Sequence, residues 1–316
     1  MRHLAKSTAL FLAIGLSLYA ALFYAADRLV YRTGKSNPFY KIAVADQSSF
    51  DWVILGASHA MPLDFADFNN VMEKETGQRI LNLASQGTGP LYNRFVFEQF
   101  LAKHRTRNLL YIVDSFAFYL PTWNEERFSD AKLLGRTPFD LTIARRLSSY
   151  SLHKGVDVLT LLDYLTGFSK INNRERFERD IWEGEKQFDR VFRPSPTMVK
   201  SRIGYLFPMP LTSTGLDHYL GVFDGLVALA QQQGIRVVAI KMPLPPDFYG
   251  QIPNQAEFDA AIDSLLAKRQ VVYLDFSSAL PEPRFYFDTD HLNRAGVTEL
   301  FEKHFKAILQ SPTAFQ

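Results

Sequence analysis

The chain has 316 residues, of which 47% are hydrophobic and 22% are charged, a balance typical of one large globular domain or two small ones. Its formal net charge is only +2 and it contains no long basic stretch, so a nucleic-acid partner is not expected. The chain contains no cysteine, which excludes disulfides, thiolate metal sites and a cysteine nucleophile.

The N-terminal segment, residues 7–26, is apolar and carries no charged side chain. As a helix this stretch would measure roughly 30 Å, the thickness of the hydrocarbon core of a bilayer. It lacks a clean small-x-small cleavage site, so we expect it to cross the lipid bilayer as an uncleaved signal anchor. Basic residues flank both ends, and by count they lean slightly against an outward-facing C-terminal part. Gly34, Asn37 and Pro38 break the following linker, so residues 1–50 are predicted to form an anchor and linker.

The rest of the chain alternates between short apolar runs and amphipathic stretches. The apolar runs predict strands at 51–55, 79–84, 108–114, 235–241 and 271–275. The amphipathic stretches predict helices at 64–76, 91–104, 215–233, 257–269 and 293–309.

This alternation predicts a three-layer α/β/α fold with a five-stranded parallel sheet, occupying residues 51–316. Residues of about 120–212 interrupt the pattern and predict a mostly helical insertion. The insertion could shape a substrate groove, dock a partner or be a simple embellishment. In open parallel sheets the functional crevice lies beyond the carboxyl ends of the strands, so the residues that follow each strand are the candidates for function.

Ser58 follows the first predicted strand within the sequence Gly-Ala-Ser-His-Ala. A tight turn there would expose its hydroxyl and aim nearby backbone N–H groups at an oxyanion. A serine hydroxyl becomes a good nucleophile only when a base accepts its proton. A serine that merely caps a helix or closes a turn is the alternative.

The spacing of Asp288 and His291 near the C-terminus suits such a base. A carboxylate three residues before a histidine can bind one imidazole nitrogen while the other nitrogen faces the serine. A structural loop histidine, or a metal site formed by Asp288, Asp290 and His291, are the alternatives. The other six histidines are scattered along the chain, so we expect no metal.

Together, GASHA after the first strand and DTDHLNRAG before the last helix resemble the SGNH (GDSL-like) hydrolase superfamily. The resemblance implies a flavodoxin-like sheet, with Ser58 as nucleophile, His291 as general base and acid, and Asp288 as the orienting carboxylate. Asp290 competes for that last role. An α/β-hydrolase is disfavoured, because its nucleophile elbow follows several strands rather than the first.

The segments between these two motifs match the corresponding sequence blocks of the family less well. The resemblance implies an oxyanion hole formed by Ser58, by Gly87 (with Ser85 as the runner-up) and by a third donor. The family's third-block Asn is missing, and Ser115 could replace it, whereas an ionised Asp114 could not. His59, Ser85 and Asp290 are the expected substrate-binding residues.

The anchor and these departures resemble one branch of the superfamily, which includes the alginate O-acetylation proteins and the D-alanyl transfer protein of teichoic acid synthesis. This resemblance implies an inner-membrane protein with its soluble domain outside, an acyl donor, an envelope-glycan acceptor and a multi-pass membrane-bound O-acyltransferase as partner. The acyl-serine mechanism that it implies requires no dissociable cofactor. A membrane-tethered esterase or lipase, and a non-catalytic scaffold or glycan-binding protein, are the alternatives. The loop at 242–249 could wall the acyl pocket or serve only as scaffolding.

Overall fold

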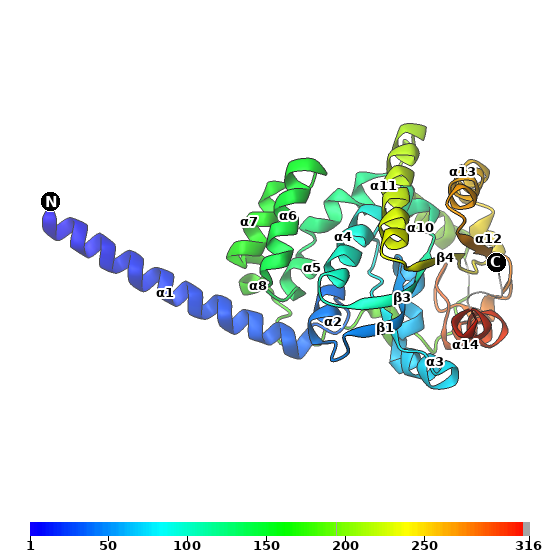
Figure 1. The fold of residues 1–316 in the computed structure, drawn as a ribbon, viewed down its shortest axis with the longest axis horizontal. Coiled ribbons are helices and arrows are strands. Elements are labelled where there is room, and N and C mark those ends of the chain that lie inside the picture. The colour runs from blue at the N-terminus through cyan, green and yellow to red at the C-terminus, as the bar shows by residue number, and fades with distance from the viewer. Residues whose placement is uncertain (194, 312–316) are drawn as a thin grey trace. The chain divides into compact units, whose positions relative to one another are not determined.

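The computed structural model describes residues 1–193 and 195–311, so the last five residues of the predicted α/β domain lie outside the described part (Figure 1). Contacts between residues in space divide the chain into two compact units. Unit 1 comprises residues 1–44 and 128–180, and unit 2 comprises residues 45–127 and 181–316.

Unit 1 is helical. Its helices are α1 (Arg2–Thr33), α2 (Pro38–Val44), α5 (Ala131–Arg136), α6 (Leu141–His153), α7 (Val158–Thr166) and α8 (Phe168–Asn172). Helix α1 is long and apolar enough to cross a membrane. It continues past the apolar segment into the folded part of unit 1, where Val30 and Thr33 are buried. There, Asp27 accepts hydrogen bonds from the Phe139 N–H and from the Lys170 Nζ.

Unit 2 contains the sheet. Its strands are β1 (Ser49–Leu55), β2 (Ile80–Asn82), β3 (Arg105–Ile112), β4 (Arg236–Lys241) and β5 (Val272–Asp275). Its α-helices are α3 (Phe68–Thr76), α4 (Pro90–Leu101), α9 (Glu183–Lys186), α10 (Pro196–Leu206), α11 (Ser213–Gln232), α12 (Pro246–Tyr249), α13 (Gln255–Lys268), α14 (Arg294–Leu300) and α15 (Lys306–Gln310). The 3₁₀ segments are η1 (Ser58–Asp67), η2 (Ser115–Phe118), η3 (Pro121–Trp123), η4 (Glu125–Ser129, which runs into unit 1) and η5 (Pro283–Phe285), and a π-helical turn, η6 (Phe301–Phe305), joins α14 to α15.

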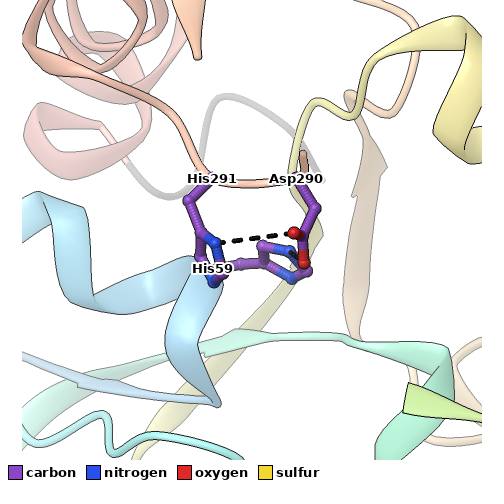
Figure 2. A group of neighbouring side chains, drawn as sticks. All are labelled: His59, Asp290 and His291. Carbon is purple, nitrogen blue, oxygen red and sulfur yellow. Dashed lines mark hydrogen bonds and ion pairs between the residues drawn. The ribbon is translucent and has the colours of Figure 1, made fainter. Parts of the chain in front are cut away.

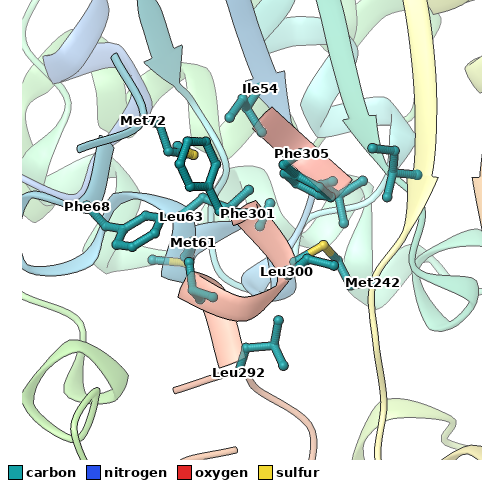
Figure 3. Packing of buried hydrophobic residues seen from close by; sticks show 14 of the residues in the cluster. Ile54, Met61, Leu63, Phe68, Met72, Met242, Leu292, Leu300, Phe301 and Phe305 are labelled. Carbon is teal, nitrogen blue, oxygen red and sulfur yellow. The ribbon is translucent and has the colours of Figure 1, made fainter. Parts of the chain in front are cut away.

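The five strands form one parallel sheet in the order β2-β1-β3-β4-β5. Successive side chains of a strand point to opposite faces of the sheet, so the central strands β1, β3 and β4 contribute buried side chains to both faces. One layer holds Trp52, Ile54, Leu110 and Ile112, which pack in one core cluster with α14, η6 and α15 (Figure 3). On the other face, the ring of Tyr111 packs against that of Phe223 of α11, with 4.6 Å between the ring centroids. The predicted three-layer α/β/α fold is therefore confirmed.

The predicted elements differ from the observed ones mainly at their ends. The helix expected at 64–76 begins only at Phe68, because Ala66 and Asp67 adopt left-handed backbone conformations that separate α3 from η1. Gly34 ends α1 as expected, but the linker after it forms the helix α2. The segment expected as one insertion, 120–212, is divided between the two units: residues 128–180 belong to unit 1, and residues 120–127 and 181–212 belong to unit 2.

Candidate active site

Ser58 begins η1, directly after the carboxyl end of β1. The turn between them depends on Gly56, whose φ is +150° and whose missing Cβ would lie 2.9 Å from Cβ of Ile112 on the neighbouring strand. A side chain at position 56 would therefore be strained and would push β1 from β3. Because Ser58 is the first residue of η1, its N–H has no acceptor within that helix and stays available to an anion.

The segment that carries His291 forms a tight turn after η5. The Phe287 N–H donates to the His291 carbonyl at 3.0 Å, and Tyr286 bridges to Leu292. Inside this turn, Oδ1 of Asp288 accepts the N–H groups of Asp290 (3.0 Å) and His291 (2.8 Å). The turn thereby fixes the Asp288 carboxylate beside the imidazole that follows it.

Ser58, His291 and Asp288 lie in one hydrogen-bonded chain. Nε2 of His291 is 2.9 Å from Oγ of Ser58, and its Nδ1 is 2.9 Å from Oδ2 of Asp288. Asp290, the competing carboxylate, is farther from the same nitrogen, with Oδ1 at 3.7 Å. A serine, a base and an orienting carboxylate at these distances can move a proton from the hydroxyl to the imidazole.

Asp290 belongs instead to a second, buried network. Arg202 of α10 donates from Nε and Nη2 to its carboxylate at 2.8–3.0 Å. His59 donates from Nε2 to Asp290 at 3.2 Å and from Nδ1 to Asp114 at 2.5 Å. Burial would lower the pKa of His59, but the charge and hydrogen bond of Asp114, with those of Asp290, raise it to about 10. His59 is therefore an imidazolium at neutral pH.

The pKa of Asp290 is shifted in the opposite direction. Burial would raise it, but the charges of His291 and Arg202 and the hydrogen bond from His59 hold the pKa well below its usual range. Asp290 is thus an ionised carboxylate bound by Arg202 and His59, whereas Asp288 lies within hydrogen-bond distance of Nδ1 of His291.

His59, Asp290 and His291 also lie close enough together for their donor atoms to hold one metal ion (Figure 2). The chemistry of these donors does not suit a metal. His59 carries a proton on both ring nitrogens, and Arg202 already binds both oxygens of Asp290. A divalent ion here would have to displace a guanidinium and a proton, because metals bind the neutral imidazole.

The N–H and O–H groups of the expected oxyanion-hole residues differ in whether they already have a hydrogen-bond acceptor within the protein. Gly87 follows β2 in a left-handed conformation (φ +63°), and its N–H has no backbone acceptor among the described residues. The N–H of Ser85 donates to the Gly56 carbonyl at 3.3 Å, which leaves only its buried hydroxyl, without a partner in the described part of the chain. Ser115 Oγ donates to Oε1 of Gln255 at 3.2 Å.

The site is closed in this structure. Ser58 and His291 are 3% and 1% exposed, and the ring of Trp182 stands edge-on to the His291 imidazole at 5.1 Å. The Trp182 ring thus contacts the imidazole at a site whose serine and histidine side chains are both buried.

A cavity of about 160 Å³ lies beside Asp288. Pro245, Pro246 and Asp247 of the 242–249 loop line it, together with Asp288, Thr289 and Tyr286. The cavity has room for several water molecules or a short acyl chain. The loop at the end of β4 thus forms one wall of a cavity that ends on the carboxylate of the candidate triad.

Sequence reasoning did not assign a role to three residues around the site. Arg202 lies in the interrupting segment, where nothing in the sequence marks it. Trp182 lies in the same segment. Asp114 follows β3 at the carboxyl edge of the sheet, and this position alone was a signal that its side chain would reach the site.

No family model matches the chain, and no curated protein matches it in sequence. Among solved structures, the chain is similar to a candidate acylhydrolase from Bacteroides fragilis, with 8% identity, a TM-score of 0.42, and coverage of 84% of this chain and 88% of that one. It is also similar to a GDSL-like lipase from Bacteroides thetaiotaomicron, with 8% identity, a TM-score of 0.40, and coverage of 86% and 94%. Likenesses this distant carry no argument about activity, which must be argued from the residues of this chain.

Proposed function

We propose that the chain is a serine esterase or O-acyltransferase that works through an acyl-serine on Ser58. The observation that carries this proposal is the hydrogen-bonded chain from Ser58 Oγ through His291 to Asp288, with distances of 2.9 Å at both links. Each member lies at the carboxyl end of the sheet, in a turn whose backbone bonds hold it.

In the first step, Ser58 Oγ attacks the carbonyl carbon of an acyl donor and His291 Nε2 accepts the hydroxyl proton. The tetrahedral intermediate collapses, its bond to the leaving oxygen breaks, and His291 returns the proton to that oxygen. In the second step, His291 deprotonates an incoming hydroxyl, whose oxygen attacks the acyl carbon; the bond from that carbon to Ser58 Oγ then breaks, and His291 returns the proton to Ser58 Oγ. Asp288 stabilises the imidazolium that forms in both steps.

The negative charge of the intermediate needs donors. The N–H groups of Ser58 and Gly87 are our candidates, because neither has a backbone acceptor in the described part of the chain. The positive charge of His59 lies close by, since its ring centroid is 4.8 Å from that of His291. We propose that His59 and Arg202 keep Asp290 ionised and bound, so that only Asp288 is free to orient His291.

We further propose that the acyl group is exchanged with a cell-envelope polysaccharide on the outer side of the inner membrane. The apolar helix α1 supports membrane attachment. A multi-pass O-acyltransferase would then supply the donor.

The test is to trap the intermediate. The full chain in detergent is mixed with a p-nitrophenyl acyl ester, quenched in acid and digested, and the peptide that contains Ser58 is weighed. An added acyl group on that peptide, absent in Ser58→Ala and present in the control Ser277→Ala, supports the proposal. Acylation that appears elsewhere or persists in Ser58→Ala would overturn it. Repeating the reaction with acetyl-free oligosaccharides separates a transferase, which acylates the sugar, from an esterase, which releases only acid.

A further inference from the structure

Helix α7 of unit 1 exposes four apolar side chains and buries Thr160 and Tyr164. Val158, Leu159, Leu162 and Leu165 recur at the spacing of one helix face and are 44–64% exposed. Thr160 on the opposite face is 2% exposed, and Tyr164 is 2% exposed with its hydroxyl bonded to the Pro138 carbonyl at 2.8 Å. A helix on the surface of a water-soluble domain shows the reverse arrangement.

Contacts within unit 1 join this helix to the apolar segment of α1. The Tyr19 hydroxyl donates to the Thr166 carbonyl, the last residue of α7, at 3.1 Å. The ring of Phe23 covers Gly167 so closely that a Cβ there would clash with it. Tyr19 lies seven residues before Ala26, the end of the uncharged stretch. At the rise of a helix this places the end of α7 roughly 10 Å inside the apolar span.

Several polar side chains near α7 are paired inside the protein. Lys170 is 3% exposed and forms an ion pair with Asp27 at 2.6 Å. Asp163 accepts the N–H of Ser169 at 2.7 Å. The side chains left facing outward around the end of α7 include Leu162, Leu165 and also Phe168, which is 62% exposed. Such a surface suits a hydrocarbon environment, where unpaired polar groups are costly.

We propose that α7 lies in the membrane interface, with Val158, Leu159, Leu162, Leu165 and Phe168 inserted among the lipid acyl chains. The inference rests on α1 crossing the membrane, and it is independent of the proposed chemistry at Ser58. Amphipathic helices that lie in the interface bury their apolar face by about 5–10 Å, the depth that the Tyr19 contact gives. The chain would thus be held by one crossing helix and one interfacial helix, which fixes unit 1 against the bilayer.

The absence of cysteine makes the test direct, because single cysteines can be introduced into the full chain without removing others. Leu162→Cys is labelled with an environment-sensitive fluorophore and reconstituted into phosphatidylcholine–phosphatidylglycerol vesicles. Leu16→Cys on α1 reports whether the span is inserted. Val71→Cys on α3 of unit 2 is the matched control, with 46% exposure against 50% for Leu162.

We expect nitroxide groups on the lipid chains to quench the fluorophore at positions 162 and 16, and a water-soluble quencher to act only at position 71. Quenching of position 162 from water, with position 16 quenched from lipid, would overturn the proposal while leaving α1 as a span. Shielding of position 162 from both quenchers would assign the face to a protein contact and also overturn it. Lack of lipid quenching at position 16 would remove the premise and the proposal together.

Discussion

Replacing Arg202 by methionine tests the buried network around Asp290, the feature that sequence reasoning missed. Arg202 donates to both oxygens of Asp290 at 2.8–3.0 Å, and the two side chains are 23% and 0% exposed. Removing one partner of a buried ion pair costs about 3–5 kcal/mol. His59 and the Thr289 hydroxyl, which donates to Oδ1 of Asp290 at 2.6 Å, still bind the carboxylate, so we expect the lower end, about 3 kcal/mol. That loss corresponds to a melting temperature about 6–12 °C lower for a chain of this size.

Tryptophan fluorescence measures this change in unit 2 alone, because all three tryptophans, Trp52, Trp123 and Trp182, lie there. Lys200→Met is the matched control, since Lys200 is an exposed residue of the same helix. The double variant Arg202→Met/Asp290→Asn should recover part of the loss, because no carboxylate is then left buried without its cation. A single variant within about 0.5 kcal/mol of the control, the range of ordinary surface changes, would refute this account of the network.

Three further results are expected. Asp288→Asn should lower kcat for ester hydrolysis by about 10⁴-fold with little change in KM, because the imidazolium loses its carboxylate. If Asp288→Asn instead stays near wild type and Asp290→Asn shows the loss of about 10⁴-fold, the orienting role belongs to Asp290. The pKa of His59 is raised to about 10 in the folded chain, so its contribution to stability is full below about pH 6.5 and is lost as the pH rises toward 10, with a slope of up to about 1.4 kcal/mol per pH unit. Measurements of the free energy of unfolding against pH should show that slope in wild type and in the control His218→Gln. An unchanged slope in His59→Gln would contradict the assignment. Gly56→Ala should destabilise unit 2 by about 1–3 kcal/mol more than Gly77→Ala, since both glycines have positive φ but only position 56 lacks space for a Cβ; equal melting temperatures would count against the tight turn before Ser58.

Much of the fold could be predicted from the sequence because buried parallel strands are continuous apolar runs. The five expected strands correspond to β1–β5, and the helix expected to end at residue 76 does end at Thr76, before the left-handed Gly77. The start of that helix was expected at residue 64, whereas α3 begins at Phe68. No side-chain periodicity could show that Ala66 and Asp67 adopt left-handed conformations.

The candidate site could be predicted only where its residues belong to short sequence motifs. Ser58, Asp288 and His291 belong to short motifs with their own spacing, and the structure brings them within hydrogen-bond distance. Arg202 comes from a helix about 90 residues before Asp290, and only tertiary packing joins the two. The role expected for His59, a substrate contact, remains a prediction, but its two ring nitrogens are both used within the protein.

The central claim is that Ser58 is an activated nucleophile, and labelling with a fluorophosphonate probe tests it most directly. The full chain in detergent is compared with Ser58→Ala, His291→Ala and the control Ser277→Ala, all checked for folding by tryptophan fluorescence. We predict labelling of wild type and Ser277→Ala, and its loss in the other two variants. A folded wild-type chain that does not react, or a Ser58→Ala variant that reacts equally, would contradict the claim.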